Sequence, residues 1–453
     1  MKYALAVKIK NVLHTKNTRN AALRNNIVLS AVLKVIGLLT SLAIVPITLH
    51  YLENETYGVW LTITSILYWF SFFDIGLGNG MRNYLTEALS KGNYAIGRAY
   101  LSTTLLMLSF LAIGLAVIFA FPLSFIDMAG LFNTTTVSSG MLRQVMCIAV
   151  VFTLVLFVVK NIGYVFVALQ HYALNDALVV GGSVLSLLAV YVLSLTTEGN
   201  LTYVVLAFTV IPVVVYFLAA IPIFYRYPEL RPSLKAVDWQ LGKRIVTKGL
   251  GFFFIQITSC LVIYGSSNLF ITNLCGPSSV TTYNIAYKFF FLLAIGYTIV
   301  IAPMWNAYTD AYVKGEMGWI QSNFRRTLNI WCLTLVAGLL MLSFSGLFYK
   351  LWVGDSVNVP FTTSAWVLIY ISAYNLNNCA TYLLNGLNKI RVQIYTSVFF
   401  TLVYLLLVYF SGSRWGCNGI IGSMAICYML MSIIHLYQCH LLIRNKATGV
   451  WNK

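Results

Sequence analysis

Three lysines lie inside long apolar stretches of the sequence, where a charged side chain is unusual. Lys34, Lys160 and Lys288 are each flanked by runs of Leu, Ile, Val, Phe or Ala. A lysine at the centre of a bilayer costs roughly 2.5–3.5 kcal/mol on insertion scales, so it normally faces water, protein or a ligand. The chain carries 29 Lys and Arg against 12 Asp and Glu. We therefore expect a cationic interior that binds an anion.

Uncharged polar residues are predicted to line the same interior. Ser41 shares a face with Lys34 at 100° per residue. Asn375 and Asn378 lie along one side of their apolar segment, and Gln256 lies on a polar face of another. For the amides, the alternative is hydrogen bonding between helices. For the lysines, it is snorkelling of the long side chain to the membrane surface.

The composition places these residues in a membrane. Of the 453 residues, 59% are hydrophobic and 9% are charged, whereas soluble domains average about 25% charged. A bilayer core about 30 Å thick needs roughly 20 apolar residues per helical span. The sequence therefore predicts an all-α, polytopic integral membrane protein of about 12 transmembrane helices. The predicted spans are 27–51, 57–77, 100–121, 145–168, 175–195, 201–225, 249–274, 284–306, 329–349, 364–386, 392–411 and 418–442.

The distribution of basic residues orients these spans. With the N-terminus inside, 23 of the 29 Lys and Arg residues fall in inner segments and 3 in outer segments. The positive-inside rule therefore puts both termini in the cytoplasm. The basic residues are scattered over short breaks between apolar runs and form no basic face, so we expect no nucleic-acid partner.

The chain repeats itself at about half its length. Residues 86–93 (TEALSKGN) return as residues 309–316 (TDAYVKGE), and each copy follows the second span of its half. An even number of spans per half makes the copies parallel repeats, which predicts two six-helix bundles around a central cleft, with alternating access by rocking. The predicted parts are a basic arm 1–26, an N-terminal bundle 27–225, a basic cytoplasmic linker 226–248, a C-terminal bundle 249–443 and a tail 444–453.

Three short motifs resemble those of one transporter family. Tyr57–Trp60 (YGVW) opens the second span, Phe73–Gly78 (FDIGLG) closes it, and Tyr283–Lys288 (YNIAYK) opens the eighth. In order and spacing they resemble the polysaccharide transporters, the family of the Wzx-type O-antigen flippases. That family lies within the multidrug/oligosaccharidyl-lipid/polysaccharide (MOP) superfamily, and the likeness covers essentially the whole chain.

The resemblance implies a function in the synthesis of surface polysaccharides. Members of the family flip undecaprenyl-pyrophosphate-linked oligosaccharide units from the inner to the outer leaflet of the bacterial inner membrane. The pyrophosphate would suit the three intramembrane lysines, with Arg82 and Lys248 at the cytoplasmic mouth. Asp74 is the residue predicted to couple flipping to a proton or sodium gradient, and no cofactor is expected. The implied partners are the lipid-linked oligosaccharide, membrane lipid, and the polysaccharide polymerase and chain-length machinery.

Two alternatives stand beside this interpretation. A multidrug exporter, or another exporter of the same superfamily, would bind cationic drugs through acidic residues in its bundles, and such residues are scarce here. A membrane-embedded glycan polymerase or ligase would carry acidic or His residues in a large outer loop. The longest predicted outer loop, 122–144, contains Asp127 and Arg143 and little else. Because no Cys or His cluster has metal-ligand spacing either, we predict a transporter without a metal site and not an enzyme.

Overall fold

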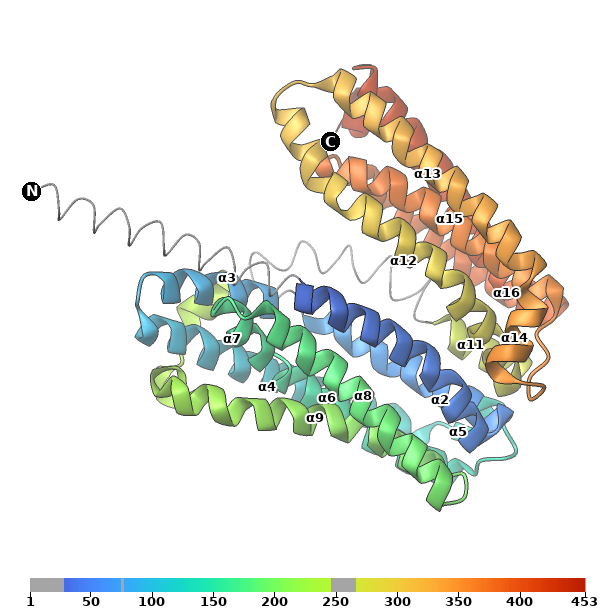
Figure 1. Ribbon diagram of the computed structural model, residues 1–453, viewed down its shortest axis with the longest axis horizontal. Helices are drawn as coiled ribbons and strands as arrows, with labels where there is room; N and C mark the ends of the chain where they lie inside the picture. Colours follow the sequence, from blue (N-terminus) through green and yellow to red (C-terminus); the bar gives the residue numbers. More distant parts are fainter. Residues whose placement is uncertain (1–27, 75–76, 246–265, 453) are drawn as a thin grey trace, which may run out of the picture. The chain divides into compact units, whose positions relative to one another are not determined.

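The computed structural model describes residues 28–74, 77–245 and 266–452, and across these residues it contains helices and no strands (Figure 1). Inside a bilayer every backbone N–H and C=O must find a partner within the protein, so apolar segments of this length form helices. Eight helices in the described part are long and apolar enough to cross a membrane. The predicted all-α, multi-pass architecture is therefore confirmed.

Two compact units divide the chain. The first joins the residues up to Tyr51 with Asp74–Ser124 and Val145–Gly251, and the second joins Leu52–Phe73, Phe125–Gln144 and the residues from Phe252 onward. Two segments from the first half of the sequence thus pack with the C-terminal half. The predicted domain boundaries around the 226–248 linker stay a prediction.

The described residues of the first unit include five helices of 21 residues or more and two shorter ones, α3 and α7. Large apolar side chains on its outer faces are strongly exposed, as in Val117 (66%) and Ile221 (65%), which suits contact with lipid tails. The Oγ of Ser186 donates to the carbonyl oxygen of Ala207 at 2.8 Å and ties two neighbouring helices, α8 and α9. The helices are Val28–Leu52, α3 Leu77–Ser90, α4 Tyr94–Phe125, α6 Ser139–Val159, α7 Ile162–Ala168, α8 Tyr172–Thr196 and α9 Leu201–Arg226.

The described part of the basic linker lies along α4. It forms two short 3-10 helices, η2 Pro228–Leu230 and η3 Leu234–Ala236. The backbone N–H of Ser233 donates to Ser102 Oγ at 3.0 Å, and that of Asp238 donates to Thr103 Oγ1 at 2.9 Å. Side-chain hydroxyls of α4 therefore satisfy backbone donors of the linker and fix its course over the unit.

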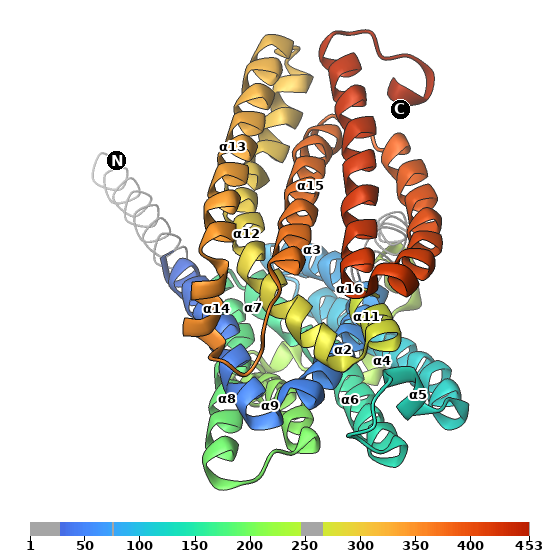
Figure 2. The same cartoon turned by 90° about the vertical axis from the view of Figure 1, so that its right-hand side faces the viewer.

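The second unit gathers α12, α13, α15 and α16 side by side (Figure 2). Helix α16 consists of two helices that meet at a kink at Gly416, whose φ of 57° and ψ of −142° are not helical. The two parts match the predicted spans 392–411 and 418–442. The helices of the unit are α2 Asn54–Trp69 with η1 Phe70–Asp74 at its end, α5 Met128–Phe132, α11 Ser267–Cys275, α12 Pro277–Val313, α13 Met317–Ser343, α14 Ser345–Val353, α15 Phe361–Gly386 and α16 Arg391–Ile443, followed by η5 Gly449–Asn452.

The two copies of the repeated octapeptide form the same helix end. In the first, Lys91 Nζ lies 2.6 Å from Glu87 Oε1, and Gly92 follows with a φ of 70°. In the second, Lys314 Nζ lies 2.6 Å from Asp310 Oδ2, and Gly315 follows with a φ of 75°. The hydrogen bond to Asp310 raises the pKa of Lys314.

The backbone closes both helix ends in the same way. Asn93 N donates to Ala88 O at 2.9 Å, and Glu316 N donates to Ala311 O at 2.9 Å. Each is the six-to-one bond of a Schellman cap, in which glycine supplies the left-handed residue. The sequence repeat is therefore also a repeat of local structure.

The cap geometry predicts that alanine is less well tolerated at Gly315 than at the neighbouring Gly318. We expect Gly315→Ala to lower the apparent melting temperature of the detergent-solubilised protein, because an L residue at positive φ costs about 1–2 kcal/mol. Gly318 is the matched control: both sites have open space for a Cβ, but Gly318 has no positive φ. Gly318→Ala should be neutral or slightly stabilising. Equal shifts for the two variants would contradict the strained-cap account.

Candidate substrate-binding site

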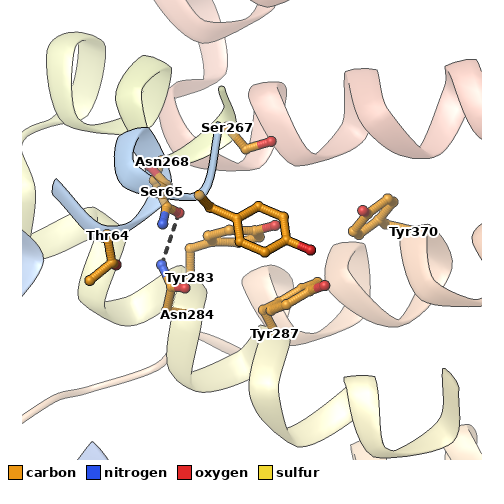
Figure 3. A pocket seen from close by; sticks show the side chains of 9 residues that line it. Thr64, Ser65, Ser267, Asn268, Tyr283, Asn284, Tyr287 and Tyr370 are labelled. Atoms are coloured by element: carbon orange, nitrogen blue, oxygen red, sulfur yellow. Dashed lines mark hydrogen bonds between the residues drawn. The ribbon is translucent and has the colours of Figure 1, made fainter. Parts of the chain in front are cut away.

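A cavity of about 310 Å³ lies within the second unit, among α2, α11, α12 and α15 (Figure 3). Its volume is at the lower end of the roughly 300–1,000 Å³ that small-molecule sites occupy. Its lining is polar and aromatic, and none of the lining side chains that the structure describes carries a charge. The residues are Thr64, Ser65 and Tyr68 from α2, Ser267 and Asn268 from α11, Tyr283, Asn284 and Tyr287 from α12, and Tyr370 from α15.

Two asparagines form a hydrogen-bonded pair at one side of the cavity (Figure 3). Asn268 Nδ2 donates to the carbonyl oxygen of Leu61 at 3.2 Å, which ties α11 to α2. Asn284 Nδ2 donates to Asn268 Oδ1 at 2.9 Å and to the carbonyl oxygen of Val280 at 2.9 Å. Both amide hydrogens of Asn284 are therefore used inside the protein. The group that this side chain offers to a ligand is its carbonyl oxygen, a hydrogen-bond acceptor.

Tyrosine side chains form the other side of the cavity. The ring centroids of Tyr283 and Tyr287 lie 5.6 Å apart, and Tyr287 stacks on Tyr370 at 6.4 Å with an interplanar angle of 23°. Tyr370 is completely buried, and its hydroxyl has no hydrogen-bond partner among the described residues. Leaving a buried polar group unpaired costs about 1–3 kcal/mol. A water molecule or a ligand hydroxyl in the cavity would remove that cost.

Close backbone packing holds α2 against the helices that form the rest of the cavity. A Cβ on Gly58 would lie 1.9 Å from the carbonyl oxygen of Pro277, the first residue of α12. One turn further on, Thr62 hydrogen-bonds Thr272 of α11, and both side chains are fully buried. Only glycine permits this approach, so the α2 wall of the cavity depends on Gly58.

The predicted residues of the second unit that the structure describes share helices with the cavity but are not among the residues that line it. Lys288 is half-buried and directly follows Tyr287 on α12. Asn375 is buried on α15, and its Oδ1 has no hydrogen-bond partner in the described part of the chain. Asn378 lies on the same helix and is half-buried. The structure places these residues on two of the helices that form the cavity, α12 and α15.

Three predicted residues come together in the first unit. Asp74 lies close enough to Lys160 to interact with it electrostatically, and Tyr164 interacts with both Asp74 and Arg82. Asp74 Oδ1 also accepts from the backbone N–H of Gly78 at 3.1 Å, so the carboxylate satisfies an open donor in the first turn of α3. The Lys160 ammonium lies 5.4 Å from the Phe157 ring centroid, a cation–π distance.

The remaining predicted residues lie on the first span or outside the described residues. Lys34 and Ser41 are both exposed on the helix Val28–Leu52 within their unit. Lys248 and Gln256 lie outside the described residues, so their predicted roles stay predictions. Among the residues that the structure describes, no group of three or more His, Cys, Asp or Glu could hold a metal ion.

The cavity itself was not among the sequence-based predictions of site residues. Tyr283, Asn284 and Tyr287 belong to the YNIAYK motif, and their i, i+1, i+4 spacing places them on one helical face. Thr64, Ser65 and Tyr68 have the same spacing on α2. That shared spacing was the available signal. Nothing in the sequence shows that these two faces, more than 200 residues apart, face each other.

A buried polar chain was also missed in the second unit. His435 Nδ1 lies 2.8 Å from Asn377 Oδ1, and His435 Nε2 lies 2.8 Å from Thr396 Oγ1. The imidazole is 1% exposed and joins α15 to both parts of α16. Sequence analysis selected Asn375 and Asn378, the neighbours of the asparagine that makes this contact. Such interhelical hydrogen bonds are how polar groups are commonly accommodated in membrane bundles.

Comparison with known proteins supports the resemblance found in the motifs. The chain is 24% identical over 421 residues to a protein of Salmonella typhimurium named "Putative O-antigen transporter", covering 90% of this chain and 93% of that protein. It is 25% identical over 310 residues to a protein of the same name from Salmonella typhi, covering 67% of each. No family model matches the chain.

Solved structures show the fold. The chain resembles an inward-facing multidrug resistance MATE family transporter of the MOP superfamily with a TM-score of 0.72 at 14% identity, covering 90% of this chain and 95% of that one. An outward-facing MATE structure gives a TM-score of 0.58 at 13% identity, covering 95% and 96%. The fold of the chain is therefore similar to the fold of these transporters. The relatives and the fold together support transport by a multi-pass membrane protein.

The close packing at Gly58 can be tested by one added methyl group. We expect Gly58→Ala to lower the apparent melting temperature of the solubilised protein, because overpacking a tight contact costs about 1–3 kcal/mol or more. Gly296→Ala on α12 is the control, since a Cβ there meets nothing within 4 Å. Tolerance of Gly58→Ala at full stability would show that the α2–α12 approach relaxes easily.

Proposed function

We propose that this chain is a flippase for undecaprenyl-pyrophosphate-linked oligosaccharides, such as O-antigen repeat units. It would move them from the inner to the outer leaflet of the bacterial cytoplasmic membrane. The observation that carries the proposal is the match along 90% of the chain to a protein named as an O-antigen transporter. The YNIAYK and FDIGLG motifs and the MOP transporter fold support the same assignment.

The charge of the chain fits an anionic substrate. A pyrophosphate carries at least two negative charges, and the chain has a formal net charge of +17. Lys160 and Arg82 share a corner of the first unit with Asp74, and Lys288 lies on α12 of the second unit. In the proposed mechanism these cations, with Lys34 and Lys248, attract the pyrophosphate, while alternating access exposes the site to each leaflet in turn.

Several finer assignments belong to this proposal. Both termini would be cytoplasmic, following the 23 to 3 distribution of basic residues. Asp74 would couple flipping to a proton or sodium gradient, although its hydrogen bond to Gly78 already gives it a structural role at the start of α3. The polymerase and chain-length machinery that act on the flipped unit would be functional partners.

Multidrug export is the second candidate, because the structural neighbours are named as multidrug transporters. A site for cationic drugs would be expected to present a carboxylate, since tyrosine rings alone attract a cation by only about 0.5–2 kcal/mol. Among the described residues that line the cavity of the second unit, none is acidic. This observation favours the oligosaccharide flippase. A membrane-embedded glycan polymerase or ligase is the candidate from another class.

The leaflet position of the lipid-linked unit tests the proposed function. In cells that lack this protein, we expect lipid-linked repeat units to accumulate on the cytoplasmic side and surface polymer to disappear. Membrane vesicles of known sidedness, treated with a glycan-reactive reagent that cannot cross the bilayer, would measure this position. Re-expression of the wild-type chain should restore both readouts. Units that reach the outer leaflet normally but stay unpolymerised would instead assign the protein to a step after translocation.

The cationic residues can be tested in the same assay. We expect Lys34→Ala, Lys160→Ala and Lys288→Ala each to reduce flipping severalfold, because each removes a positive charge from the path of the pyrophosphate. Lys→Arg at the same positions should be milder, since arginine keeps the charge and binds phosphate well. Lys350 is the control: it lies exposed beside Asp355 at 3.7 Å, and Lys350→Ala should leave flipping unchanged. Wild-type flipping by the triple alanine variant would rule out the cationic path.

A further inference from the structure

We propose that the tyrosine-lined cavity of the second unit binds an uncharged sugar ring of the transported molecule, an assignment that rests on the proposed function. The cavity would hold part of the oligosaccharide while the cationic residues hold the pyrophosphate. Its lining of tyrosines, asparagines, serines and a threonine is the chemistry that recognises carbohydrate.

The tyrosine wall suits the apolar face of a sugar. A pyranose presents C–H bonds on one face and hydroxyls around its edge, so it stacks on an aromatic ring and hydrogen-bonds at the rim. Tyr283 and Tyr287 lie on consecutive turns of α12, and Tyr287 in turn stacks on Tyr370. Three rings from two helices therefore give the cavity an extended aromatic surface (Figure 3).

The polar groups of the cavity are set up to meet hydroxyls. The two donors of Asn284 are already bound to Asn268 and to the backbone, so its side chain offers an acceptor. The buried hydroxyl of Tyr370 has no partner among the described residues, and it lies on the cavity wall. A sugar hydroxyl can donate a hydrogen bond to the Asn284 side-chain oxygen. It can also donate to the Tyr370 hydroxyl or accept from it.

Other ligands fit these observations less well. A phosphate group would lose its hydration without gaining a cation, since the described lining residues include no Lys, Arg or His. A lipid tail would leave the Tyr370 hydroxyl and the asparagine acceptor unpaired. A cationic drug would find no carboxylate. At about 310 Å³ the cavity has room for one or two sugar rings, and not for a whole repeat unit.

Saturation-transfer difference NMR on the full-length protein in detergent micelles tests the assignment. The probes are methyl α-glucoside, methyl α-mannoside, methyl α-galactoside and methyl N-acetyl-glucosaminide, with empty micelles as the blank. We expect saturation of the ring C–H protons of at least one glycoside. Tyr287→Ala should weaken its binding by about tenfold or more, because it removes the central ring of the stack. Tyr395→Ala, which removes an exposed tyrosine of α16, should leave binding unchanged.

Tyr370→Phe separates ligand binding from packing. It keeps the ring and removes only the unpaired hydroxyl, so the protein should stay as stable as the wild type, or become more stable. Glycoside binding should nevertheless fall by about two- to tenfold, which corresponds to one lost hydrogen bond. A purely structural role for the tyrosine would leave binding untouched.

The outcomes separate this assignment from the proposed function. No glycoside signal, or a signal that Tyr287→Ala leaves unchanged, overturns the sugar site, even if the leaflet assay still shows flipping. Binding of sodium pyrophosphate or tetraphenylphosphonium that is lost in Tyr287→Ala would also overturn it, in favour of an anion or a cation site. Glycoside binding that depends on Tyr287 and Tyr370 supports it, even if the leaflet assay shows that the protein is not the flippase.

Discussion

The close approach of α2 to the first turn of α12 is the contact on which the candidate site depends. A single absent side chain, at Gly58, lets the helix lie against the carbonyl oxygen of Pro277. Further along α2, two contacts join it to α11: the buried Thr62–Thr272 hydrogen bond and the bond from Asn268 to the backbone of α2. Because close-packed interiors transmit small displacements, a shift at this one crossing would move Thr64, Ser65 and Tyr68 relative to the tyrosines of α12.

The membrane imposes a second constraint on how polar groups are arranged. Apolar side chains cover the outer faces of the helices, so the polar side chains of the interior must find partners within the protein. The chain does this in small clusters, of which the Asn268–Asn284 pair and the Asn377–His435–Thr396 chain are examples. The Tyr370 hydroxyl and the Asn375 amide oxygen are among the buried side-chain atoms that lack a hydrogen-bond partner in the described part of the chain. A ligand or water that hydrogen-bonds such a group removes the free-energy cost of leaving it unpaired.

The helical membrane architecture could be predicted from the sequence, but the candidate substrate-binding site could be predicted only in part. Apolar stretches of about 20 residues and the repeated octapeptide are local signals, and they predicted the spans and the internal repeat. The residues of the cavity are a different case, because their meeting depends on which helical faces pack together. The lysines could be selected from the sequence because a charge is costly in a bilayer. Tyrosine is common in membrane proteins, so only the structure shows that Tyr283 and Tyr287 line a cavity.

The matching glycine caps bear on how such a chain could arise. Each cap ends a helix with a pair of lysine and an acidic residue four positions before it, a left-handed glycine and the same type of backbone bond. In the predicted topology each half has an even number of spans and returns the polypeptide to its starting side, so joining two copies end to end requires no inversion. In a symmetric pair of identical subunits the two halves have the same sequence. In a duplicated polypeptide the two halves can differ and specialise. Here the tyrosine cavity lies in one compact unit, and the Asp74–Lys160 corner lies in the other.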